Sequence, residues 1–283
     1  MTAVDLPQGK LGPDVMSALS GARSPKFLAT RDTEGIPNVV PVLSLEAADD
    51  QTIIFGEIMI WKTRRNLVVD PRVAVLVLSP DLRAWSIKGR FVEFQRTGAY
   101  FDHISASENL RFNAYSGIRS AGVIQVLDVS RSFKLSTAGL LIDAARGRWL
   151  ARRLSRNGLD GGAMPPQVRD KFSQLQAAKA AAFLDASGHP DCLAALSLVP
   201  AGPGRLVGTG HALEHLVGVP PGSPVAAAVI TPKAVAYQVK GRLEGWRRSL
   251  GRRLSVIDVR EAYSACPPLP GERLPANTNP DRP

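Results

Sequence analysis

An internal repeat constrains the fold of this 283-residue chain more than any other feature of its sequence. Residues Asp70–Phe94 align with Gly222–Trp246 at an offset of 152, and eight of these 25 positions are identical. About one or two identities would be expected by chance. The identities include Lys88-Gly89-Arg90, which recurs as Lys240-Gly241-Arg242. The chain therefore contains two copies of one folding unit.

Short apolar segments rich in β-branched residues, separated by turn residues, predict that this unit is mainly β. In the first copy the expected strands are Lys26–Arg31, Pro37–Leu45, Ile53–Ile60, Val73–Leu78, Arg83–Gln95 and Val123–Val129, with helices at Val15–Ala22 and 98–117. Strands joined by short turns favour an antiparallel barrel over a parallel sheet. Pro41 cannot donate a backbone hydrogen bond and predicts an edge strand, a bulge or a place where a flat ligand lies along the backbone, and the edge strand is favoured. Gly89 predicts a bulge or a close backbone approach.

The repeat and the distribution of glycine and proline divide the chain into parts. We expect a first barrel with flanking helices at residues 1–157, a linker at 158–166 and a second, degenerate barrel at 167–265. A disordered, proline-rich tail is expected at 266–283. Within these parts, we expect a strongly basic helix at Leu140–Asn157 and a further helix at Gln167–Phe183.

A basic turn in the first copy is the one segment that suggests a chemistry. Lys62, Thr63, Arg64, Arg65 and Asn66 lie where an apolar strand is followed by a short helix. Unpaired backbone N–H groups at the start of a helix attract an anion, and cationic side chains add charge-assisted hydrogen bonds, so this turn can hold a phosphate. The alternative is a solvated turn in which Thr63 or Asn66 only caps the helix.

The second copy has a different sequence at this turn, with His211, Ala212, Leu213, Glu214, His215 and Leu216 in place of the basic residues. Glu214 would repel a phosphate. The strands were therefore kept in both copies and the anion site in one, which favours a ligand-binding role for Lys62–Asn66. The two histidines have the spacing to share a metal on a helix, but no third ligand accompanies them, and we expect no metal site.

The chain is basic, with a net charge of +10 and a pI of about 10.1. Arginines carry the excess in two clusters, Arg146, Arg148, Arg152, Arg153 and Arg156, and Arg242, Arg247, Arg248, Arg252 and Arg253. No aromatic platform accompanies them, so a solvated face or an acidic partner is favoured over nucleic acid. Two distant cysteines predict no disulfide framework. With no export signal and no apolar run of membrane-spanning length, we expect a cytoplasmic protein without membrane contact.

Four ordered segments resemble the pyridoxamine 5′-phosphate oxidase-like, FMN-binding split β-barrel family. They are 35–42 (GIPNVVPV), 61–67 (WKTRRNL), 70–75 (DPRVAV) and 88–90 (KGR). The resemblance covers residues 24–130, with a weaker echo at 180–262. It implies two tandem split β-barrels, mainly β with flanking helices, the second degenerate.

The resemblance also implies a site. The flavin phosphate would lie on Lys62 and Thr63, with Arg64, Arg65 and Asn66 beside it, and the ring would lie along Val40, Pro41, Val42 and Ser44. His103 and Arg111 are candidate substrate contacts on the helix at 98–117. No catalytic acid or base can be assigned. A homodimer with the flavin at its interface is the expected assembly.

Two functions follow from the resemblance. The first is an FMN-dependent oxidoreductase acting on a small, planar substrate. The second is a carrier or sensor that binds FMN, a deazaflavin or haem without turnover. The segment that characterises true pyridoxamine phosphate oxidases near their carboxyl end is not found after Val126, so that particular activity is not expected.

Overall fold

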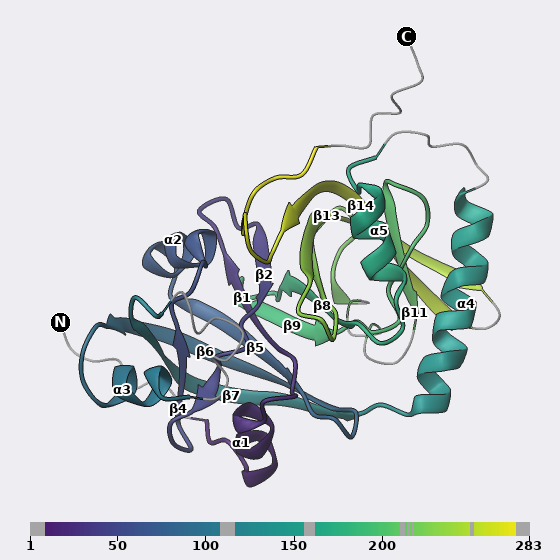
Figure 1. Cartoon of the computed structure of the whole chain (residues 1–283). Coiled ribbons are helices and arrows are strands. Elements are labelled where there is room, and N and C mark those ends of the chain that lie inside the picture. Colours follow the sequence, from purple (N-terminus) through teal and green to yellow (C-terminus); the bar gives the residue numbers. More distant parts are fainter. Residues whose placement is uncertain are drawn as a thin grey trace.

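A computed structural model describes residues 9–107, 117–155, 162–209, 213, 216, 218–249 and 252–275. Two curled antiparallel sheets lie side by side, one from each half of the chain (Figure 1). The first half contains α1 (Pro13–Ser20), β1 (Lys26–Arg31), β2 (Pro37–Pro41), β3 (Glu46–Ala47), β4 (Thr52–Gly56), α2 (Trp61–Val69), β5 (Arg72–Leu78), β6 (Arg83–Gln95), α3 (Ala99–Ser105) and β7 (Ala121–Lys134). Helix α4 (Thr137–Ser155) connects it to the second half.

The second half repeats the first helix and the seven strands of the first half in the same order. It contains α5 (Pro166–Ser173), β8 (Ala178–Leu184), β9 (Pro190–Ala194), β10 (Val199–Pro200), β11 (Arg205–Thr209), β12 (Pro224–Ile230), β13 (Ala236–Ser249) and β14 (Arg252–Ser264). The strand order of the first sheet, β2-β1-β5-β6-β7-β4-β3, is matched by β9-β8-β12-β13-β14-β11-β10 in the second. The chain therefore folds as two tandem split β-barrels, as the repeat predicted.

Both predictions made from single residues of the first copy are confirmed. Strand β2, which contains Pro41, lies at the edge of its sheet. At Gly89 the β6–β7 register shifts, and a Cβ there would lie 2.6 Å from Ile124 Cγ2. Gly241 lies at the same kind of shift, and its Cβ would lie 2.0 Å from the Asp258 carbonyl oxygen. Both copies therefore require glycine at this bulge.

The two barrels pack against each other through one face of each sheet. Residues of β1 and β5 alternate, with Leu28 and Val75 in the first barrel's own core and Phe27 and Leu76 at the contact between barrels. The second barrel contributes alanines from β8 and β12 to this contact: Ala178, Ala180, Ala182, Ala226 and Ala228. Small side chains let the two sheets approach closely, and burial of apolar surface stabilises the pair.

Two of the expected helices end earlier in the chain than the sequence predicted. The helix expected at Gln167–Phe183 ends at Ser173, and the alanine-rich segment after it forms strand β8. Alanine favours a helix in isolation, but the burial of both faces of this segment between two cores overrides that preference. In the helix expected at 98–117, α3 ends at Ser105, and residues 108–116 lie outside the described part.

The tail expected to be disordered is ordered over residues 266–275. It folds back on the end of β14, where Gly271 N–H donates to the Ser264 carbonyl and Leu274 N–H to the Ala262 carbonyl. Leu274 also packs against the hydrophobic core of the second barrel. In the described ranges, no helix combines the length and apolarity that a bilayer crossing requires.

Candidate functional site

Symmetry-related contacts hold the two barrels together. Lys88 pairs with Asp185, and the equivalent Lys240 lies 4.0 Å from Asp32. Lys88 and Lys240 occupy the same position of the two repeats, as do Asp32 and Asp185. The Lys-Gly-Arg motif therefore recurs because each copy uses its lysine to contact the other copy.

Buried amide and hydroxyl groups follow the same symmetry. Gln238 Nε2 donates to Asn38 Oδ1 at 3.0 Å and to the Val39 carbonyl at 2.7 Å. In the equivalent position of the other copy, Ser86 Oγ donates to Asp191 Oδ1 at 3.0 Å. The two barrels of one chain thus form a pseudo-dimer. The space between them is lined by residues of both halves.

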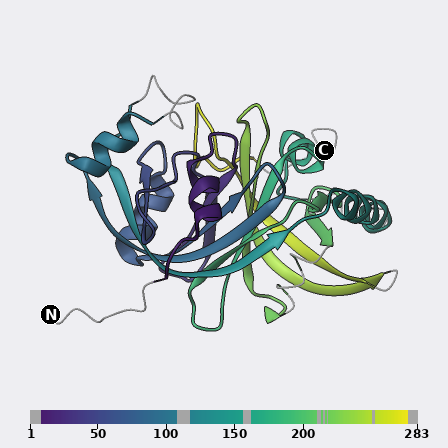
Figure 2. The same ribbon diagram turned by 90° about the horizontal axis from the view of Figure 1, so that it is seen from below.

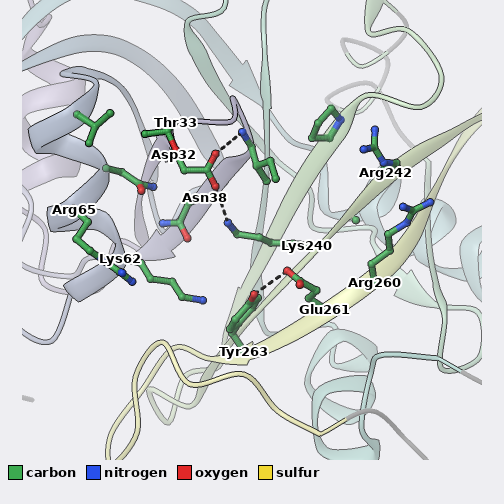
Figure 3. Close-up of a pocket in the computed structure, with 15 residues that line it drawn as sticks. Asp32, Thr33, Asn38, Lys62, Arg65, Lys240, Arg242, Arg260, Glu261 and Tyr263 are labelled. Atoms are coloured by element: carbon green, nitrogen blue, oxygen red, sulfur yellow. Dashed lines mark hydrogen bonds and ion pairs between the residues drawn. The ribbon is translucent and has the colours of Figure 1, made fainter.

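A cavity of about 630 Å³ lies at one of these sites, between α2 and β2 of the first barrel and β13 and β14 of the second (Figure 3). This volume is within the range of about 300–1,000 Å³ that is usual for small-molecule sites. Its polar lining consists of Asp32, Thr33, Asn38, Lys62, Arg65, Asn66, Lys240, Arg242, Arg260, Glu261 and Tyr263. Five of these side chains are cationic and two are carboxylates, so the lining favours an anion.

Helix α2 presents its cations to this cavity from one side. Lys62, Arg65, Asn66 and Val69 line it, and their spacing of three and four residues places them on one helical face. The cationic lining thus lies along the side of the helix as well as near its first turn, where the sequence predicted a phosphate.

Two buried side-chain contacts fix the position of α2. Asn66 Nδ2 donates to Thr30 Oγ1 on β1 at 3.0 Å. Asn38 Nδ2 on β2 donates to Thr63 Oγ1 at 3.3 Å. Thr63 is 1% exposed and does not line the cavity, so its hydroxyl serves to attach the helix to the sheet.

Lys62 is the half-buried cation at the centre of this face. Its Nζ lies 3.2 Å from the centre of the Tyr263 ring, a cation–π contact between the two barrels. Burial, with Lys240 as the next cause, lowers the pKa of Lys62 from 10.5 to about 8. Among the described residues, no carboxylate lies within ion-pair distance of Lys62 or Arg65. Glu261 acts on Lys62 from beyond that distance, so an anion in the cavity would supply a counter-charge in direct contact.

Tyr263 and Glu261 form the opposite wall, on β14. The Tyr263 hydroxyl donates to Glu261 Oε2 at 2.8 Å. Burial, together with this bond, raises the pKa of Tyr263 to about 12, so the phenol stays protonated at neutral pH. Glu261 is thereby directed toward Tyr263, and the cationic groups remain the strongest electrostatic feature of the cavity.

Arg64, which the sequence analysis grouped with the phosphate contacts, lies elsewhere. Its Nη1 is 2.6 Å from Glu57 Oε2, and its guanidinium is 4.6 Å from the centre of the Phe94 ring. It does not line the cavity. The helix therefore uses Arg64 to attach to its own barrel and Lys62 and Arg65 to face the second one.

The residues predicted to contact a flavin ring lie at a second, smaller cavity. Pro41, Val42 and Ser44 line a space of about 130 Å³, together with Gly56, Ile58, Ile60, Ile230, Ala234 and Pro267. Val40 packs against the core of the first barrel. Three of the predicted ring contacts thus line the smaller cavity, and three of the predicted phosphate contacts, Lys62, Arg65 and Asn66, line the larger one.

Of the two weaker candidates, His103 is the one that the structure describes, and it does not line the cavity. His103 Nε2 lies 3.1 Å from Glu46 Oε2, on the side of the barrel that α3 covers. Arg111 lies outside the described residues, as do His211 and His215. Within the described residues, no group of three or more histidine, cysteine or acidic side chains is placed to hold a metal.

The residues that the second barrel contributes to the cavity were not predicted from the sequence. Lys240 and Arg242 were visible as a repeated motif, but they were interpreted as part of the barrel framework. No pattern in the sequence around Glu261 and Tyr263 indicates that they line a binding site. Their role depends on which strands the two barrels place opposite each other.

Comparison with known proteins agrees with this architecture. Residues 16–130, less than half of the chain, match the family of pyridoxamine 5′-phosphate oxidase. The first barrel is thus similar to that family, and the resemblance predicted from sequence is confirmed. No curated protein is similar enough to match the chain.

Several solved structures are similar to one barrel-sized part of the chain. HupZ from Group A Streptococcus is 23% identical, covers 45% of this chain and 95% of its own, and has a TM-score of 0.36. An FMN-binding protein from Syntrophomonas wolfei is 21% identical, with coverage of 43% and 83% and a TM-score of 0.35. HutZ, a haem storage protein from Vibrio cholerae, is 14% identical, with coverage of 44% and 94% and a TM-score of 0.32.

Proposed function

We propose that the cavity between the barrels binds the phosphate of FMN and that the protein is an FMN-dependent oxidoreductase for a small, planar substrate. The observation that carries this proposal is the convergence of Lys62, Arg65 and Lys240 on a cavity of about 630 Å³. Neither Lys62 nor Arg65 has a carboxylate partner among the described residues, so a bound phosphate would gain charge-assisted hydrogen bonds from both. The match of residues 16–130 to the oxidase family supports a flavin as the ligand.

The chain's own residues have separable roles in this proposal. Lys62 and Arg65 bind the phosphate, and Lys240 closes the site from the second barrel. Asn38 and Asn66, both hydrogen-bonded within the first barrel, hold α2 against the sheet so that the cations stay directed into the cavity. When bound, FMN would supply hydride or single-electron transfer, which the protein tunes by orientation and electrostatics.

The ring is proposed to lie along β2 beside Val40, Pro41, Val42 and Ser44. The adjoining space of about 130 Å³ is smaller than a ring system needs, and Pro267 lines it from the segment that follows β14. Entry of the ring therefore requires this segment to move away from β2. The phosphate contacts do not depend on that movement.

A second function is favoured by the same small cavity. Ile230, Ala234 and Pro267 of the second barrel line the space beside Pro41–Ser44, where a substrate would have to meet the ring. A ligand enclosed in this way would be held without turnover. The alternative is therefore a carrier or sensor for FMN, a deazaflavin or haem.

An absorption spectrum of the purified protein tests the cofactor. Oxidised-flavin bands, or their appearance on adding FMN, support the flavin proposal, and a Soret band supports haem instead. A colourless protein that does not bind added FMN would disprove both flavin functions. Anaerobic mixing of the flavin form with NADH or NADPH then separates enzyme from carrier, because only the enzyme should be bleached.

The assembly is a separate proposal. The resemblance to the family predicts a homodimer, whereas one chain already pairs two barrels through the Lys240–Asp32 and Lys88–Asp185 contacts. We therefore expect one flavin per chain, whatever the number of chains. Light scattering combined with a flavin-to-protein ratio tests both points.

A further inference from the structure

Helix α4 has apolar residues on two opposite faces. One face packs on the second barrel, where Leu150 and Ala151 join a core with Val199, Val207 and Val256. Leu141, Ile142 and Trp149 are directed away from that core, and 54%, 50% and 40% of their surfaces are exposed. The helix lies at the outer edge of the molecule in both views (Figures 1 and 2). An apolar stripe is therefore presented to the surroundings on a convex helix.

Arginines flank this stripe without acidic neighbours on the helix. Arg148, Arg152 and Arg153 are exposed, and the guanidinium of Arg153 lies 3.9 Å from the centre of the Trp149 ring. The single carboxylate of α4 belongs to Asp143, which is buried and lies 3.9 Å from Arg146. The exposed face of the helix is thus apolar and cationic at once.

A hollow of about 410 Å³ opens beside the arginines. Arg148 and Arg152 line it together with Ser173 and the segment around Pro200. Arg148 Nη2 donates to the Ser173 carbonyl at 3.1 Å, which holds the guanidinium at the rim. The volume is sufficient for a phosphate-bearing headgroup.

We infer that the exposed face of α4 binds the surface of an anionic membrane. The aliphatic and indole side chains would enter the boundary between headgroups and acyl chains, and the arginines would contact lipid phosphates. A single convex helix suits a flat lipid surface better than it suits a protein groove. Leu141 and Ile142 are apolar and would make no favourable contact with the phosphates of a nucleic acid. The inference concerns surface binding and is independent of the proposed flavin site.

Co-sedimentation with vesicles tests this inference on the full chain. The vesicles are phosphatidylcholine alone and phosphatidylcholine mixed with phosphatidylglycerol. One variant combines Leu141→Ser, Ile142→Ser and Trp149→Ser, and another combines Arg148→Gln, Arg152→Gln and Arg153→Gln. The matched control is Trp61→Ala, because Trp61 is also exposed and has an arginine, Arg119, 4.2 Å from its ring centre.

The wild-type protein and the Trp61→Ala control should sediment with the anionic vesicles and not with phosphatidylcholine alone. The arginine variant should bind at least about tenfold more weakly, since each arginine near an anionic surface contributes several-fold to affinity. The serine variant should lose at least as much, because it removes the apolar side chains that would enter the boundary between headgroups and acyl chains. Circular dichroism checks that the variants are folded. Failure of the wild type to bind, or an equal loss in the control, would overturn the inference. Binding to duplex RNA that the arginine variant loses, with no vesicle binding, would identify a nucleic-acid surface instead.

Discussion

The ammonium group of Lys240 lies 4.0 Å from the carboxylate of Asp32 and connects the second barrel to the first at the wall of the cationic cavity. Lys88 and Asp185 make the equivalent pair in the other copy. On the Lys240 side, the cations of α2 complete a cavity. On the Lys88 side, His189 Nε2 lies 3.0 Å from the Val73 carbonyl, where the first copy has Ile36. The two halves of the pseudo-dimer have therefore diverged at equivalent positions.

Replacing Lys62 or Arg65 by alanine should weaken FMN binding by about 1.5–3 kcal/mol each, which is the usual contribution of a charge-assisted hydrogen bond. Flavin fluorescence titration gives the dissociation constants. Arg64→Ala is the matched control because Arg64 pairs with Glu57 outside the cavity. If Arg64→Ala weakens binding as much as Lys62→Ala, the phosphate has been placed on the wrong face of α2.

FMN affinity should fall as the pH rises from about 7 to about 9. The pKa of Lys62 is lowered to about 8 by burial and by Lys240, so its positive charge is lost in this interval. The phosphate itself stays a dianion throughout, since its second pKa is about 6. Bound phosphate favours the charged lysine and will move the midpoint upward. The Lys62→Arg variant should bind with little pH dependence, and a wild-type affinity that is flat with pH would contradict the assignment.

The unfolding free energy should rise with pH between about 7 and 9.5, in part because of Lys179. Burial lowers the pKa of this lysine from 10.5 to about 7, so the unfolded chain binds a proton that the folded protein does not. Each such group adds up to about 1.4 kcal/mol of stability per pH unit in that interval. Lys26, Lys62 and Lys240 have lowered pKa values as well and contribute with the same sign.

The Lys179→Met variant isolates this effect in urea unfolding at several pH values. The slope of its unfolding free energy with pH gives the number of protons taken up on unfolding, and this number should be smaller than in the wild type by up to one. It should also be less stable at pH 9 by about 1–3 kcal/mol, because the Leu196 and Leu198 carbonyls that accept hydrogen bonds from Lys179 lose their donor. Equal slopes would show that Lys179 is charged in the folded protein.

Replacing Gln238 by alanine should destabilise the contact between the barrels by about 2–4 kcal/mol, because it leaves Asn38 Oδ1 and the Val39 carbonyl without this buried donor. Ser86→Ala is the comparison, since Ser86 holds the equivalent position with a hydrogen bond to Asp191. It should cost about 1–2 kcal/mol. Gln238→Ala should also weaken FMN binding, because Asn38 positions Thr63 and α2. A loss of stability with unchanged FMN affinity would show that the contact between the barrels does not affect the proposed FMN site.

The sequence determined the architecture of each half of this protein. Short apolar segments, turn residues and the glycine of the Lys-Gly-Arg motif are local signals, because each depends on the residues of one strand or hairpin. Because the second half repeats the sequence of the first, the same signals predicted its fold as well. The basic segment Lys62–Asn66 could be recognised for the same reason, since its residues are neighbours in the chain, and its assignment to a phosphate stays a prediction.

Tertiary structure alone decided how these parts form a site. Within the turn, Lys62 and Arg65 face the second barrel, Arg64 pairs with Glu57, and Thr63 is buried against Asn38, which depends on the rotation of α2 about its axis. Lys240 and Tyr263 reach Lys62 because the two sheets pack face to face through alanines. Contacts between residues about 180–200 positions apart are set by that packing, and no local pattern in the chain encodes them.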